Sequence, residues 1–82
     1  MSALKGEKPM IRIDMATLEK LRLEFPVGSR VALVKMDDQQ APPIGTRGTV
    51  RGVDDIGSIL VQWDNGGSLS VVFGEDECRK ID

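Results

Sequence analysis

Acidic side chains in short runs are the residues of this chain with the clearest chemical potential. They form the pairs Asp37-Asp38 and Asp54-Asp55 and the run Glu75-Asp76-Glu77. Carboxylate oxygens bind hard cations, and two carboxyl groups facing each other across a cleft catalyse acid–base reactions. None of the three runs has the spacing of a calcium-binding loop, and a domain this small rarely forms the cleft that a carboxylate pair needs. We therefore interpret these acids as solvated turn residues and expect no metal site.

Nucleophilic catalysis lacks suitable residues in this sequence. The chain has no His and no Tyr, and its one cysteine, Cys78, has no base near it in the sequence. Ser–His and Cys–His mechanisms are therefore excluded, and a zinc site would lack its Cys and His ligands. The glycines form no phosphate-binding loop, because no Gly-Lys-Ser/Thr follows them. We expect a non-enzymatic protein without catalytic residues or cofactors, in which Cys78 is a small packed side chain.

The distribution of charge limits the kinds of partner that the chain can bind. The formal net charge is −2, with cations in excess before residue 54 and carboxylates in excess after it. A nucleic-acid-binding protein usually has a clear basic excess, because neutralised phosphates supply most of the affinity. Arg47 and Arg51 are expected on one face of a strand, and with Arg30 and Lys35 they would form a modest basic patch. Such a patch is either a phosphate-binding surface or a solvated face balanced by nearby acids.

Binding to a protein is the function that these constraints favour. Single-stranded nucleic acid is usually held by exposed aromatic side chains beside basic residues, whereas Trp63 and Phe73 are expected in the core. The loop 36–44 contains a Pro-Pro pair, which favours a stiff polyproline-like path and is the predicted protein-contact element. The candidate partner-binding residues are Arg47, Arg51, Met36, Asp37, Asp38, Pro42 and Pro43.

Length and composition are typical of one small domain in a reducing compartment. The chain has 82 residues, of which 40% are hydrophobic and 29% are charged, an ordinary composition for a globular protein. No apolar run is long enough to span a membrane, and residues 1–9 lack the apolar region of a signal peptide. The single cysteine excludes an internal disulfide and fits a reducing environment. We expect a cytoplasmic protein.

A short helix is expected after a flexible arm, residues 1–13. Asp14 is a typical N-cap, and Pro26 cannot continue a helix. Between them, four apolar residues recur near helical spacing: Met15, Leu18, Leu21 and Phe25. We predict a helix over residues 14–25 that packs this stripe over one open end of the β domain. The alternative is a surface for a dimer or another partner.

Residues 26–82 have the pattern of short β-strands joined by tight turns. β-Branched runs are separated by Gly and by Asp or Asn at spacings of about ten residues, which predicts consecutive hairpins. Gly48 and Gly52 lie within one of these strands and indicate a sharp bend or a bulge. We expect five strands around a core of alternating apolar residues: Val31, Leu33, Val50, Val61, Trp63 and Val71.

The turn at Asn65-Gly66-Gly67 allows two hairpin registers. A two-residue loop would place Trp63 opposite Ser68, which pairs large apolar residues with small polar ones. A three-residue loop would place Trp63 opposite Leu69, so that the large apolar residues of both strands share one face. We favour the second register, which requires Gly67 in the left-handed conformation of a bulged hairpin.

The order of these motifs resembles that of Src-homology-3-like barrels, including those with a KOW motif. The resemblance rests on the segments Gly28-Ser29-Arg30-Val31, Gly45-Thr46-Arg47-Gly48-Thr49-Val50 and Val61-Gln62-Trp63. The turn at residues 63–66 also resembles that of the Mind-bomb/Herc-type barrel, a protein-binding module. From about Phe25 to Ile81 the chain resembles a bacterial family of unknown function, number 4314, in its Pro-Pro, Gly-Thr-x-Gly-Thr-Val, Val-Asp-Asp-Ile-Gly and Trp-Asp-Asn-Gly segments. The resemblance implies a small barrel and an origin in phages, plasmids or other mobile elements.

We therefore predict a mostly β fold, with a small five-stranded Src-homology-3-like barrel over residues 26–82 preceded by one short N-terminal helix. The predicted function is that of a protein-binding accessory protein of a phage or mobile element. Two alternatives remain open, an anti-CRISPR-type inhibitor of a host defence nuclease and a KOW-like nucleic-acid binder.

Overall fold

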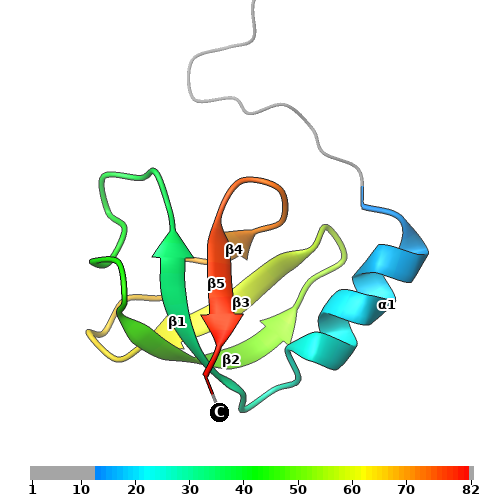
Figure 1. Ribbon diagram of the computed structural model, residues 1–82, viewed down its shortest axis with the longest axis horizontal. Coiled ribbons are helices and arrows are strands. Elements are labelled where there is room, and N and C mark those ends of the chain that lie inside the picture. The colour runs from blue at the N-terminus through cyan, green and yellow to red at the C-terminus, as the bar shows by residue number, and fades with distance from the viewer. Residues whose placement is uncertain (1–12, 82) are drawn as a thin grey trace, which may run out of the picture.

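Helix α1 (Met15–Glu24) comes first in the part of the chain that the structure, a computed structural model, describes, which is residues 13–81 (Figure 1). The Asp14 side chain accepts a hydrogen bond of 2.7 Å from the backbone N–H of Thr17, so the predicted N-cap is confirmed. Leu18 and Phe25 are buried, whereas Met15 is 74% exposed. The apolar stripe therefore packs through Leu18 and Phe25. The prediction that Met15 packs with them was wrong, because Met15 lies on the first turn of the helix and faces outward. Apart from Ile13, the predicted arm, residues 1–13, lies outside the described residues.

Five antiparallel strands in one sheet follow the helix, as the sequence predicts. Their order across the sheet is β4-β3-β2-β1-β5, so the last strand returns to lie beside the first. The two outer strands, β4 and β5, also approach each other, which gives the sheet a strongly curled form (Figure 1). The strands are β1 (Arg30–Lys35), β2 (Arg47–Val53), β3 (Ser58–Trp63), β4 (Val71–Val72) and β5 (Glu77–Lys80).

Two register shifts help this sheet to curl. In the pairing of β2 with β3, Val50 faces Val61 but Gly52 faces Leu60, so Arg51 is an extra residue. A second shift occurs between β1 and β5, at Val34. Bulges bend a strand and increase its twist, and the one next to Gly52 confirms the predicted bend.

The core lies inside the curl of the sheet and contains the six residues predicted for it. Trp63, Leu33 and Val61 are at most 2% exposed, and Val31, Val50 and Val71 are equally well buried. The indole N–H of Trp63 donates a hydrogen bond of 2.8 Å to the carbonyl oxygen of Leu69, so the buried ring leaves no unpaired donor. Phe25, just after α1, is buried in the same cluster and joins the helix to the sheet.

The hairpin register predicted for β3 and β4 was wrong. Ile59 faces Val71, whereas the favoured register placed Trp63 opposite Leu69 and hence Ile59 opposite Phe73. The tight turn closes one residue earlier, with the N–H of Gly66 donating to the carbonyl oxygen of Trp63 at 2.9 Å. Gly66 therefore has the positive φ, 100°, that was predicted for Gly67. The chain then leaves the sheet, and regular pairing resumes only at β4.

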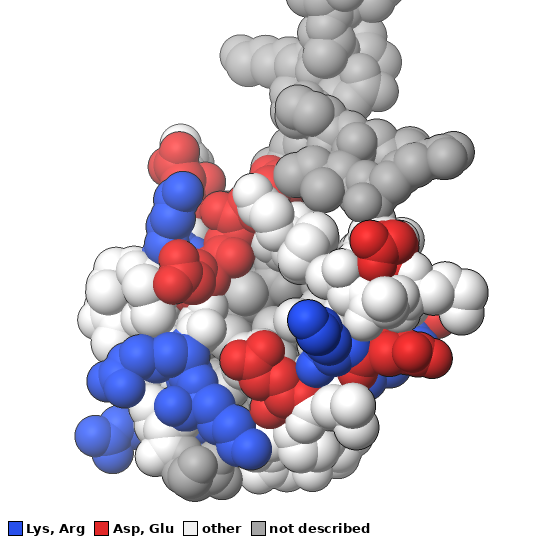
Figure 2. Space-filling model, turned by 45° about the vertical axis from the view of Figure 1, so that its right-hand side comes forward, with Lys and Arg blue, Asp and Glu red and all other residues white. Residues whose placement is uncertain are grey.

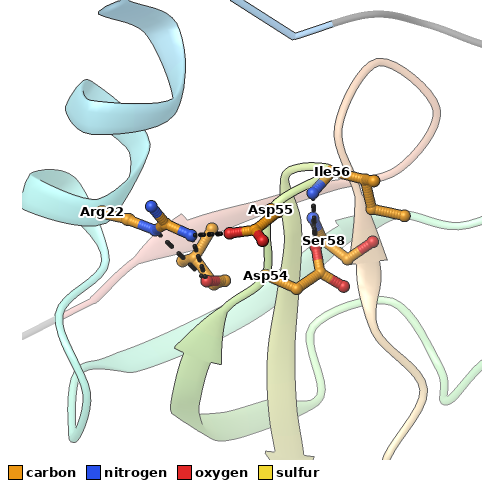
Figure 3. A network of polar contacts seen from close by, with 6 residues as sticks. Arg22, Asp54, Asp55, Ile56 and Ser58 are labelled. Atoms are coloured by element: carbon orange, nitrogen blue, oxygen red, sulfur yellow. Dashed lines mark hydrogen bonds and ion pairs between the residues drawn. The ribbon is translucent and has the colours of Figure 1, made fainter. Parts of the chain in front are cut away.

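Surface contacts of Arg22 attach helix α1 to the turn between β2 and β3 (Figure 3). Its guanidinium group donates to Asp55 at 2.9 Å and to the carbonyl oxygen of Val53 at 3.3 Å. Asp54 holds the same turn closed, because its carboxylate accepts the backbone N–H groups of Ile56 and Ser58. Both partners of the Arg22–Asp55 pair are exposed, so the pair positions the helix but adds little stability.

Candidate functional site

The outer face of β1 carries a concave surface. Val31 and Leu33 point into the core, whereas Ala32 and Val34 line the outer face of the same strand, where Ala32 is only 6% exposed. Ala32 lies directly opposite Arg47 on β2 and opposite Arg79 on β5. Directly opposed residues of antiparallel strands project from the same face. A small side chain therefore lies between two long cationic ones, and this difference in height creates a groove.

This surface, called the cationic groove below, is open to solvent and has a volume of about 800 Å³. Its walls come from the end of the β1–β2 loop and the start of β2 on one side, and from β5 and the residue after it on the other. Its lining residues are Ala32, Leu33, Val34, Ile44, Gly45, Arg47, Arg79, Lys80 and Ile81. The lining thus combines apolar side chains with three cations and contains no carboxylate.

Backbone hydrogen bonds hold both rims of the cationic groove against β1. On the loop side, the N–H of Gly45 donates to the carbonyl oxygen of Leu33 at 2.8 Å, with φ of Gly45 at 92°. This left-handed conformation suits glycine and lets the loop turn back into β2. On the other side, the N–H of Ile81 donates to the carbonyl oxygen of Arg30 at 2.9 Å. The rims are therefore part of the hydrogen-bonded framework of the sheet.

The cations of the groove differ from Arg22 and Arg30, because those two arginines form ion pairs with carboxylates. Arg30 donates two hydrogen bonds to the Asp64 carboxylate, at 2.9 and 2.6 Å, and Arg22 is paired with Asp55. The hydrogen bonds from Arg30 hold the pKa of Asp64 below its ordinary value, so Asp64 stays ionised and committed to that pair. Within residues 13–81, no carboxylate forms an ion pair with Arg47, Arg79 or Lys80. The groove therefore presents three cations that no carboxylate of the described residues neutralises through an ion pair.

Part of the molecular surface is basic. On the face in Figure 2, Lys and Arg side chains gather at the lower left without Asp or Glu among them, whereas above and to the right acidic side chains lie beside other Lys and Arg side chains. A local basic surface thus exists on a chain whose formal net charge is −2.

The two arginines predicted as a basic patch have different surroundings. Arg47 is exposed and lines the cationic groove. Arg51 is also exposed, but it is the extra residue of the β2 bulge and does not line the groove. Of their candidate neighbours, Arg30 is paired with Asp64, and Lys35 lies opposite Glu77 at the far end of β1.

The predicted contact loop, residues 36–44, is only partly available to a partner. Met36 is half-buried against the core and Pro42 is buried, whereas Asp37, Asp38 and Pro43 are exposed. The Asp38 carboxylate accepts the backbone N–H of Gln40 at 2.8 Å, which is the behaviour of a turn residue. The carbonyl oxygen of Pro43 accepts the Thr46 hydroxyl at 2.6 Å, so the Pro-Pro pair stiffens the end of the loop that forms the rim of the groove.

Two kinds of reactive site can be examined in the described part of the chain, a metal cluster and the thiol of Cys78. No group of three or more Cys, Asp or Glu side chains within residues 13–81 is placed to hold a metal ion. Cys78 is half-buried against the core, and burial, with smaller contributions from Glu24 and Glu77, raises the pKa of its thiol to about 11. The thiol is therefore protonated at neutral pH and is a poor nucleophile. No helix among the described residues is both long and apolar enough to cross a membrane.

Comparison with known proteins identifies the family. Residues 14–81 match the family described as Domain of unknown function (DUF4314). The chain belongs to this family. The match begins at the N-cap of α1 and ends one residue after β5, so the helix is part of the family's domain along with the sheet. No curated protein matches the chain.

Sequence reasoning identified one wall of the cationic groove and missed the other. Arg47 was a candidate residue, but Arg79 and Lys80 were not among the candidates. Their contribution depends on the long-range pairing of β5 with β1. The only signal in the sequence was the absence of acids between residues 78 and 81 after the run Glu75-Asp76-Glu77.

Proposed function

We propose that this protein is a non-enzymatic binding module that acts in the cytoplasm and recognises another protein through the cationic groove. The observation that supports the proposal is the composition of that groove, which joins exposed apolar surface to cations without an ion-pair partner among residues 13–81. A protein surface supplies both kinds of complementary group, since it carries apolar side chains and carboxylates together. Nucleic acid supplies chiefly phosphate to such a site.

The positions of the aromatic residues favour a protein over single-stranded nucleic acid. Trp63 and Phe25 are buried, and Phe73 is half-buried. None of them lines the cationic groove, so no aromatic ring is available there for a base to stack on. A KOW-like nucleic-acid binder is the second candidate, and it is favoured by one observation, the absence of carboxylates from the groove.

We also propose that the curled sheet is a Src-homology-3-like barrel of the KOW-like kind. The strand order β4-β3-β2-β1-β5 and the approach of β4 to β5 support this finer assignment. An origin in a phage or other mobile element is part of the same proposal and rests on the resemblance of the turn segments described above.

Affinity capture with a charge-reversed control tests the proposed function. The immobilised full chain and its Arg47→Glu/Arg79→Glu variant are incubated with host lysate, with and without prior nuclease treatment. Both arginines are exposed, so the variant should fold normally, and an unchanged emission spectrum of the buried Trp63 verifies this. We expect a protein that is retained after nuclease treatment by the wild-type chain and is lost with the variant. Two outcomes would refute the proposal. In one, the wild-type chain retains nucleic acid and no protein; in the other, it retains no protein that the variant fails to retain.

A further inference from the structure

We propose that the cationic groove binds an extended acidic segment of a partner protein, with one carboxylate held between Arg47 and Arg79 and an apolar side chain resting on Val34 and Ile44. The inference rests on the proposed function and deepens it by specifying the chemistry of the partner. It follows from three features of the groove: the spacing of its cations, the direction of its apolar surface and the absence of ion pairs to its cations from carboxylates of residues 13–81.

The first feature is the position of the two arginines. Both lie directly opposite Ala32, one on each neighbouring strand, so their Cα atoms are separated by two strand spacings, about 10 Å. The methyl group of Ala32 is short and only 6% exposed, so the anion position lies above it, between the two arginine side chains. A carboxylate fits between two guanidinium groups, because each guanidinium offers a planar pair of N–H donors matched to carboxylate oxygens.

The second feature is the apolar surface beside this anion position. Val34, two residues after Ala32, also lines the groove, at the register shift between β1 and β5, and is 36% exposed. Ile44, on the rim next to it, is 63% exposed. An extended peptide lying along β1 directs every second side chain toward the groove. An acidic residue above Ala32 therefore places the residue two positions away over Val34 and Ile44, where an apolar side chain gains most.

The third feature is the absence of a competing carboxylate. Asp64, which is close enough to Arg47 to be affected by its charge, is held by two hydrogen bonds from Arg30. Two described carboxylates, Asp55 and Asp64, form ion pairs with arginines that do not line the groove. An incoming acidic segment thus displaces no ion pair described in the structure. Phosphate would satisfy the arginines equally well, but it would leave the apolar surface of Val34 and Ile44 unused.

Fluorescence anisotropy with short labelled probes tests this inference on the full chain. The probe is the hexapeptide Glu-Glu-Leu-Leu-Glu-Glu, which presents Glu-Leu-Glu on either face when extended. The matched peptides replace every Glu by Gln, or every Leu by Ser. A labelled single strand of oligothymidine of similar length is the nucleic-acid probe. All probes are compared at low and at physiological salt, because partly exposed charge pairs are screened by salt.

Two double variants with the same change in net charge distinguish the groove from general electrostatics. Arg47→Gln/Arg79→Gln removes the two cations that flank Ala32. Lys20→Gln/Arg51→Gln removes two exposed cations that do not line the groove. Unchanged fluorescence of the buried Trp63 verifies the fold of both variants.

The expected result is binding of the Glu/Leu peptide that weakens about tenfold or more with either matched peptide and with the Arg47→Gln/Arg79→Gln variant. The Lys20→Gln/Arg51→Gln variant should bind within about twofold of the wild type. Equal binding of the Glu and Gln peptides, or equal losses in both variants, would overturn the inference. If the peptides fail while the wild-type chain still captures a nuclease-resistant protein through Arg47 and Arg79, the inference is wrong and the proposed function stands. If oligothymidine binds more tightly than the Glu/Leu peptide and depends on Arg47 and Arg79, both the inference and the proposed function are wrong.

Discussion

The replacement Gly48→Ala tests how closely β2 packs on β3. Gly48 lies directly opposite Trp63, and a Cβ atom on Gly48 would be 2.8 Å from Cε3 of that ring. It would also be 2.6 Å from Cγ1 of Val61 and 2.9 Å from the carbonyl oxygen of Gln62. Carbon atoms in favourable contact are about 3.5–4.0 Å apart, so these neighbours would have to retreat by about 1 Å. No single side-chain rotation relieves all three contacts.

The expected magnitude follows from two opposing effects. The φ angle of Gly48 is not positive, so alanine could adopt its backbone conformation and would stabilise by about 0.4–1 kcal/mol through the unfolded state. Overpacking of a dense core costs about 1–3 kcal/mol. Here the cost should lie near the upper end, because Trp63 is 1% exposed and its indole N–H is hydrogen-bonded. We expect a net loss of about 2 kcal/mol.

Urea denaturation followed by the fluorescence of the only tryptophan measures this change. With a slope of about 1 kcal/mol per molar urea, the transition midpoint should fall by about 2 M. Gly52→Ala is the matched control in the same strand, because the nearest atom to its Cβ, Cδ1 of Leu60, lies at 3.9 Å. That variant should be neutral or slightly more stable. A Gly48→Ala protein as stable as the wild type, or one destabilised no more than Gly52→Ala, would refute the close packing derived for this site.

Three further predictions concern the turn, the thiol and acid stability. Gly66→Ala should lower the free energy of unfolding by about 1 kcal/mol because of its φ of 100°, whereas Gly67→Ala should change it little; thermal unfolding showing the reverse order would contradict the turn. Since burial raises the pKa of Cys78 to about 11, iodoacetamide should alkylate it much more slowly at pH 8 than it alkylates an unfolded peptide thiol, and equal rates would contradict this. Because hydrogen bonds from Arg30 lower the pKa of Asp64 below its ordinary 3.8, its stabilising effect should be complete above that pH and lost as the pH falls toward the lower, folded pKa. The difference in Tm between the wild type and Asp64→Asn should therefore shrink below pH 3.8, and a constant difference would argue against the pair.

Local signals in the sequence were sufficient for the helix and most of the core. Asp14 and Pro26 mark the two ends of α1 because capping and helix termination depend on one or two residues. The alternation of Val31 with Leu33 and of Val61 with Trp63 predicts burial, since one face of each strand must be apolar. The bulge next to Gly52 also follows from a single residue type.

The hairpin failed because its register depends on a contact that an apolar pattern does not contain. Matching large residues across the turn favoured Trp63 opposite Leu69. The indole of Trp63 instead uses the backbone carbonyl of Leu69, which draws residues 67–70 out of regular pairing. A buried indole N–H must find an acceptor, and this requirement outweighed the gain from one more apolar pair.

The candidate site was only half predictable for a related reason. Arg47 stands in a recognisable strand, whereas the role of Arg79 depends on which strand β5 pairs with. Periodicity predicts that a strand exists but does not specify its neighbour across the sheet. Ala32 carries no functional signal of its own, and its small size matters only because two arginines flank it.

The pairing of β5 with β1 has a consequence for folding during synthesis. During synthesis β1 emerges before β5, which is the partner of its second edge. Until β5 emerges, β1 keeps an open edge, and the cationic groove has only one wall. A ligand of the groove therefore binds the completed fold and not its precursors. By mass action, a ligand at a free concentration one hundred times its Kd would raise the free energy of unfolding by about 2.7 kcal/mol. The amount of folded protein would then depend on the abundance of its partner.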